Sequence, residues 1–191
     1  MAVSLQKGQK ISLSKEAGGE LTQVKLGLGW DVAQGPQDKK GGFLGKLFGG
    51  GSGGDSIDLD ASCIMFDANK QAVDAIIVHT GDNRTGDGDG DDEVINVDLS
   101  RVPANVVSLV FTVNSFTGQT FETVENAFCR IVNANNNSEV ARYNLSAQGG
   151  HTAMVMAKVY RHNNEWKMHA IGETASGRTF HDLMPAITPH A

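Results

Sequence analysis

An acidic segment at residues 81–93, GDNRTGDGDGDDE, has the composition of a cation site. Six acidic side chains fall between Asp82 and Glu93, separated by glycines and opposed only by Arg84. Calcium suits this pattern because it takes about 6–8 oxygen ligands and turns carboxylate repulsion into attraction. Magnesium would prefer fewer protein ligands and more water, whereas zinc or copper would require cysteine or histidine, and only His79 is nearby. The alternative is a solvated acidic loop that aids solubility.

Two known calcium motifs do not fit the segment. In an EF-hand frame that starts at Asp87, Asp89 and Asp91 occupy the third and fifth positions correctly. The sixth position should be glycine but is Asp92, and the twelfth should be glutamate but is Asp98. The glycine-rich nonapeptide repeat of β-helices is excluded because the motif occurs once. The segment therefore predicts an oxygen-only metal site of another kind.

Further ligands would have to come from other parts of the chain. Asp58 and Asp60 alternate in IDLDAS, so both would point to one side of a strand, although an ordinary polar strand face would look the same. Asp31 follows the apolar segment TQVKLGLGW and fits either a ligand or a turn residue. If these loops meet at one end of a sandwich, we expect an acidic cup built from several loops.

The charge of the chain is concentrated in the acidic segment. Residues 82–93 hold six acids and one arginine, a charge of −5, which leaves −1 for the rest of a chain with net charge −6. This sign disfavours nucleic acid as a partner, because such binding depends on Lys and Arg contacts to phosphate. The N-terminus lacks the apolar run of a signal peptide, and no segment has the length of a membrane span. We therefore expect a cytoplasmic location.

Period-two alternation dominates the chain and predicts an all-β fold, an antiparallel β-sandwich of about ten short strands. The turn HNNEW at 162–166 predicts a tight hairpin, because asparagine tolerates a left-handed backbone. Short helices are expected at 120–127 and at 178–185, the second ended by Pro185. The expected strands are 10–14, 22–29, 57–66, 73–79, 94–99, 106–113, 127–133, 139–145, 153–161 and 165–171.

Three further features bear on the organisation of the chain. Residues 41–54 hold eight glycines and predict a flexible loop insertion at about 36–55, with a short apolar plug for a partner as the alternative. Cys63 and Cys129 lie in apolar segments outside any C-x-x-C motif, which predicts buried, reduced thiols. Trp30 and Trp166 are expected to pack in the core or at its rim, and Trp30, next to Asp31, should report metal binding.

Several segments together resemble the TerD family of tellurium-resistance proteins. They are GLGWD at 27–31, DLDAS at 58–62, HTGDNRTGDGDGDDE at 79–93, EVARYNL at 139–145 and YRHNNEWKMHAIG at 160–172. The resemblance spans nearly the whole chain and implies one calcium-binding β-sandwich domain over residues 1–191, with acidic loops at one end. It also implies a role in bacterial tellurite resistance and general stress response, without enzymatic activity. The glycine-rich stretch is longer than in the shorter members of that family.

The resemblance also implies a ligand set and partners. Because six acids could neutralise more than one divalent ion, two calcium ions are expected. The expected partners are other proteins of the tellurite-resistance system, and a calcium-loaded end could also bridge to a membrane surface. The alternative is a metal-assisted hydrolase or an anion-processing enzyme, which is disfavoured because the chain has no G-x-S-x-G motif and only His79 adjoins the acids. The candidate metal ligands, which cannot all coordinate at once, are Asp31, Asp58, Asp60, Asp82, Asn83, Asp87, Asp89, Asp91, Asp92 and Glu93.

Overall fold

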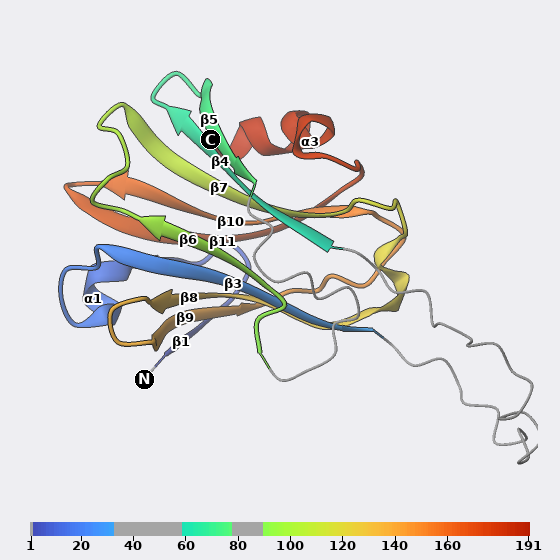
Figure 1. Cartoon of the computed structure of the whole chain (residues 1–191), viewed down its shortest axis with the longest axis horizontal. Helices are drawn as coiled ribbons and strands as arrows, with labels where there is room; N and C mark the ends of the chain where they lie inside the picture. Colours follow the sequence, from blue (N-terminus) through green and yellow to red (C-terminus); the bar gives the residue numbers. More distant parts are fainter. Residues whose placement is uncertain (1, 33–58, 78–89) are drawn as a thin grey trace, which may run out of the picture.

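The computed structural model describes residues 2–32, 59–77 and 90–191, and in these the chain forms two facing β-sheets (Figure 1). Sheet A contains, in spatial order, β1 (Val3–Leu5), β9 (Ser138–Asn144), β8 (Val124–Asn133), β3 (Gln23–Val32) and β6 (Glu93–Asp98). Sheet B contains β2 (Lys10–Ser12), β11 (Glu165–Ala175), β10 (Ala153–His162), β7 (Val106–Ser115), β4 (Leu59–Asp67) and β5 (Ala72–Ile77). The predicted all-β sandwich is confirmed.

The strand segments alternate as half-buried strands should, and their inward residues fill the space between the sheets. Leu26, Phe111 and Ile131 are among the fully buried side chains of this core. A second apolar cluster lies on the outer face of sheet B, where α3 (Phe180–Ile187) packs through Leu183 and Ile187. Figure 1 shows α3 covering sheet B from outside. The sandwich therefore has a partial third layer on one face.

The short elements differ from expectation in three places. β1 and α1 (Leu13–Ala17) were not predicted, and β1 pairs parallel to β9 in an otherwise antiparallel described sheet. Only Phe121–Thr123 of the expected helix 120–127 is helical, as the 3₁₀ turn η1, because β8 begins at Val124. The prediction that Pro185 ends the last helix was wrong, since α3 runs on to Ile187.

Two interactions explain why α3 tolerates an internal proline. Thr179 and Asp182 form a reciprocal capping box at its start, which satisfies backbone donors there. Leu183 and Ile187 are buried against sheet B and stabilise the helix on both sides of Pro185. A 3₁₀ turn, η2 (Thr188–His190), follows directly.

Other local predictions are confirmed. The β10–β11 connection is a two-residue turn in which Asn163 has φ 52° and Asn164 has φ 61°, the left-handed values expected for HNNEW. Cys63 and Cys129 are both free and buried, and Trp30 lies in the core. No helix in the described part of the chain is long and apolar enough to cross a membrane. The glycine-rich stretch falls outside the described residues.

One end of the sandwich, which we call the loop end, gathers the elements that flank the acidic segment. β3 ends there, and β4 and β6 begin there (Figure 1). The strand register agrees, because Glu93 pairs with Leu28 near the end of β3 and Leu59 pairs with Ser115 at the end of β7. The topology thus brings the described strand ends that flank the predicted ligand segments to a common end of the sandwich.

Candidate metal centre at the loop end

Two glycines of β3 create space on the outer face of sheet A for the end of the acidic segment. A β-carbon built on Gly27 would overlap the carboxylate of Asp91. A β-carbon on Gly29 would lie 2.5 Å from the carbonyl oxygen of Gly90 and 2.5 Å from ring atoms of Phe128. Any side chain at these two positions would therefore displace residues 90–91 from the sheet. The sequence GLGW allows this close approach.

Asp92 fixes the acidic segment to β3 where the regular ladder breaks. The register between β3 and β8 shifts between Gly29 and Asp31, around Trp30. The backbone N–H of Asp92 donates to the carbonyl of Leu28 at 2.8 Å. The backbone N–H of Trp30 in turn donates to Oδ2 of Asp92 at 2.8 Å. Asp92 is only 5% exposed. Its carboxylate thus satisfies a buried backbone donor at this irregular position.

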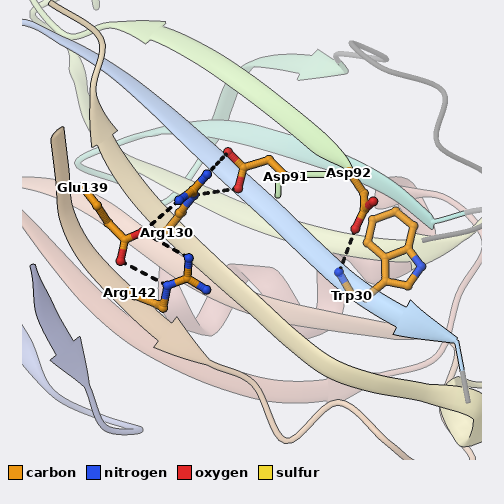
Figure 2. A network of polar contacts seen from close by, with 6 residues as sticks. All are labelled: Trp30, Asp91, Asp92, Arg130, Glu139 and Arg142. Atoms are coloured by element: carbon orange, nitrogen blue, oxygen red, sulfur yellow. Dashed lines mark hydrogen bonds and ion pairs between the residues drawn. The ribbon is translucent and has the colours of Figure 1, made fainter. Parts of the chain in front are cut away.

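Asp91 is the first member of a chain of charged side chains across sheet A (Figure 2). Both of its oxygens accept from Arg130, at 2.7 Å from Nε and 3.1 Å from Nη2. Arg130 Nη1 donates to Glu139 at 2.9 Å, and Glu139 accepts twice from Arg142 at 3.1 Å. Arg142 in turn stacks on Phe128, 3.9 Å from the ring centroid. The network ties the residues just before β6 to β8 and β9.

The network shifts the pKa values of Arg130 and Glu139. The hydrogen bond to Asp91 raises the pKa of Arg130, although partial burial opposes it. Partial burial also acts to raise the pKa of Glu139, but the hydrogen bonds from Arg142 and Arg130 outweigh it and leave that pKa below the ordinary value. Both groups are therefore held in their charged forms.

The structure separates the predicted ligands that it describes. Asp31 is exposed on the outer face of sheet A, where Oδ2 accepts from the Asn126 amide at 2.7 Å. Asp60 alternates with core residues of β4 and so faces the outer side of sheet B. Glu93 is 5% exposed and shares the inward side of β6 with Ile95.

Five of the predicted ligands lie outside the described residues. Within the described ranges, no group of three or more Asp, Glu, His or Cys side chains could hold a metal ion. The ligand set predicted from the sequence therefore stays a prediction. Of its members that the structure describes, Asp92 and Glu93 are buried. The five ligands that lie outside the described residues are Asp58, Asp82, Asn83, Asp87 and Asp89.

Sequence reasoning missed the basic side of this site. Arg130, Glu139 and Arg142 were not singled out, although each is a charged residue within a strand. One signal was present: Arg130 pairs with Gly27 in the β3–β8 ladder, so a long charged side chain stands opposite a residue with none. That pairing depends on a register between distant segments, which the sequence pattern does not reveal.

The donor set at the loop end suits a hard cation. Asp92 and Glu93 offer carboxylate oxygens at the start of β6, immediately after a segment rich in further carboxylates. Both described thiols are buried core groups, and Cys129 lies on β8 with its pKa raised to about 12 by burial. Oxygen ligands without thiolates fit calcium and do not fit zinc or copper.

Arg130→Gln should lower the free energy of unfolding by about 1–2 kcal/mol, because Asp91 and Glu139 both lose a charge-assisted partner. The pKa of Glu139 is lowered in the folded protein, so its contribution is complete above the ordinary value of 4.5 and is lost as the pH falls through the lowered value. Urea unfolding of the variant and the wild type across this range should show the difference shrinking in acid.

Arg101→Gln is the matched control, since Arg101 is exposed and its side chain forms no ion pair with the described residues. It should change stability by less than about 0.5 kcal/mol. An Arg130 variant as stable as this control at neutral pH would show that the network does not stabilise the fold.

The fold defines a two-sheet β-sandwich protein, in which Asp91 and Asp92 are held against sheet A just before β6. The chain belongs to the TerD family, because the TerD domain model matches residues 1–185. It is 51% identical over 192 residues to the tellurium resistance protein TerZ of Serratia marcescens, covering 95% of this chain and 94% of the relative.

Two further comparisons agree. The stress response protein SCP2 of Bacillus subtilis (strain 168) is 41% identical over 202 residues, which cover 96% of this chain and 98% of that protein. A crystal structure of a homologue of the telluride resistance protein TerD from Streptomyces coelicolor A3(2) superposes with a TM-score of 0.59 at 18% identity. It covers 83% of this chain and 92% of that one, and supports the fold. The resemblance to the TerD family that was inferred from the sequence is therefore confirmed.

Proposed function

We propose that this protein is a calcium-dependent binding module of the tellurium-resistance and general stress response. Relatives of this chain include a tellurium resistance protein and a stress response protein, which supports this cellular role. Calcium would be held at the loop end by Asp92 and Glu93 together with carboxylates of the preceding acidic segment. The loaded end would then bind other proteins of the same system or a membrane surface in the cytoplasm.

The burial of two consecutive carboxylates carries this proposal. Asp92 and Glu93 are each 5% exposed, and they end the acidic segment, whose residues 82–93 carry a charge of −5 in a chain of net charge −6. Burial disfavours ionised carboxylates, and neighbouring negative charges disfavour them further. A divalent cation at this position would offset both costs. It would also explain why the acidic segment is anchored so closely to β3.

Asp91 would act beside the ion in this arrangement. Both of its oxygens accept from Arg130, so it fixes the end of the segment to sheet A and orients Asp92 and Glu93. Metal sites commonly depend on such outer hydrogen bonds to hold their ligands in place. Direct coordination of the cation by Asp91, Asp31 or Asp60 stays a prediction from the sequence.

Binding, rather than catalysis, suits the described residues. Burial raises the pKa of Cys63 far above its ordinary value and that of Cys129 to about 12, so neither thiol supplies a thiolate nucleophile at neutral pH. The carboxylate of Asp92 is engaged with the Trp30 N–H and is not poised as a general base. The metal would supply charge neutralisation and a bridge to a partner.

Terbium, a luminescent substitute for calcium, tests where the cation binds. Trp30 lies in contact with Asp92 through its backbone, so tryptophan excitation should sensitise bound terbium efficiently. We expect saturable emission from the chelator-treated full chain that excess calcium abolishes. Trp30→Phe should remove most of the emission and Trp166→Phe should retain it, because these are the two tryptophans of the chain. Equal emission from both variants would place the cation elsewhere.

A further inference from the structure

A row of basic side chains crosses the outer face of sheet B. The register pairs Lys10 of β2 with His169 of β11, and His169 with Lys158 of β10. All three point outward, because their strand neighbours Ile11 and Met168 belong to the core between the sheets. Directly opposed residues in adjacent strands have β-carbons about 4.5–5.5 Å apart. Three strands that are neighbours in the sheet, β2, β11 and β10, therefore present basic groups side by side.

The C-terminal 3₁₀ turn η2 closes one side of this row. The Lys158 ammonium donates to the carbonyl of His190 at 2.7 Å, and the Lys70 ammonium donates to the carbonyl of Pro189 at 3.0 Å. His190 itself lies 2.7 Å from Glu173. Lys158 of the row and the neighbouring Lys70 are thus bonded to backbone carbonyls, which do not carry a full negative charge.

The acidic groups near the row already have partners of their own. Glu173 contacts His190 as described, and Glu165 pairs with Lys167 at 3.4 Å and accepts from Ser12. No ion pair joins Lys10, Lys158 or Lys70 to a carboxylate in the part of the chain that the structure describes. The row therefore carries uncompensated positive charge in a chain of net charge −6.

Burial and mutual repulsion both lower the pKa values of two of these basic groups, Lys158 and His169. Burial, followed by Lys70 and Lys10, lowers the pKa of Lys158. Burial, followed by Lys10, Lys158 and His190, lowers the pKa of His169. Like charges opposed across strands are destabilising, so the arrangement costs stability unless an anion offsets it. Lys10 and His169 form no side-chain hydrogen bond with the described residues, which leaves their N–H groups available to a ligand.

We propose that Lys10, Lys158 and His169 form a binding site for a doubly charged oxyanion of the phosphate class. Such an anion presents several acceptor oxygens, which suits two ammonium groups and an imidazole converging from three strands. The site lies on the outer face of sheet B, whereas the acidic segment leads into β6 of sheet A. It is therefore separate from the proposed calcium site and does not require calcium.

Inorganic phosphate is the probe. The full chain, kept in chelator at constant ionic strength, would be titrated with phosphate while the imidazole resonances of His169 are followed by NMR. We expect a saturable shift, a higher melting temperature and a raised pKa of His169, because a bound dianion stabilises the imidazolium. Lys10→Gln should weaken phosphate binding about tenfold or more, since it removes a charge-assisted hydrogen bond. Lys10→Arg should restore much of it.

Lys25→Gln is the matched control, because Lys25 is a lysine of sheet A bonded to Asn137. It should bind phosphate like the wild type. Glycerol 2-phosphate, tested in parallel, distinguishes a phosphate ester, which would bind more tightly than free phosphate, from a free oxyanion. Shifts that chloride reproduces at equal ionic strength, or unchanged affinity in Lys10→Gln, would overturn the proposal. Because calcium is absent throughout, neither result bears on the calcium site.

Discussion

Gly29→Ala should lower the free energy of unfolding by about 1–3 kcal/mol, the usual cost of forcing extra atoms into a packed region. The new methyl carbon would lie 2.5 Å from the carbonyl oxygen of Gly90, a distance that real β-carbons do not adopt. It would meet the ring of Phe128 at the same distance. The backbone oxygen cannot rotate away, so residues 90–92 must move off β3.

This movement should also weaken the site, because Asp92 would lose its short contact with the Trp30 N–H. We therefore expect Gly29→Ala to reduce calcium affinity as well as stability, measured by urea unfolding and by calcium titration of the same sample. Gly19→Ala is the control, since a β-carbon there meets nothing within 4 Å. It should stay within about 0.5 kcal/mol of the wild type. If the two variants were equally stable, the close approach of residues 90–92 to β3 would be refuted.

Asp92→Asn should remove most of the calcium-dependent stability and change the calcium-free protein much less. The asparagine carbonyl can still accept from the Trp30 N–H, whereas the negative charge that attracts the cation is lost. For the wild type, a hundredfold excess of calcium over its dissociation constant should add about 2.7 kcal/mol to the free energy of unfolding. Paired urea titrations with calcium and with chelator would measure this gain directly.

Glu20→Gln provides the comparison for Asp92→Asn. Glu20 is exposed, precedes β3 and has no side-chain hydrogen bond or ion pair in the described structure, yet its substitution changes the net charge by the same amount. It should keep the full calcium gain. If both variants lost the calcium-dependent stability to a similar extent, the effect of calcium would depend on the overall charge of the protein and not on a site that contains Asp92.

Strands β2 to β11 were predictable because each one carries its own signal, whereas β1 was not predicted. In β7, for example, Leu109, Phe111 and Val113 alternate with outward residues and mark one buried face without reference to any other segment. The hairpin at Asn163 and Asn164 was predictable for the same reason. The extent of α3 was not, because burial against sheet B stabilises it past Pro185.

The position of the acidic site was predictable, but the direction of each carboxylate was not. Asp91 and Asp92 are neighbours in sequence, yet Asp91 contacts Arg130 on the outer face and Asp92 contacts the backbone of Trp30. These partners are 39 and 62 residues away, and the register between β3 and β8 shifts around Trp30. Local periodicity cannot determine long-range register through such an irregularity.

The binding of calcium is the central claim, and isothermal titration of the chelator-treated full chain with calcium tests it most directly. We predict a saturable heat signal that is strongly reduced in Asp92→Asn and kept in Glu20→Gln. Magnesium should give a weaker signal, because it prefers fewer protein ligands and holds its water. Absence of saturable heat from calcium, together with an unchanged melting temperature, would contradict the claim.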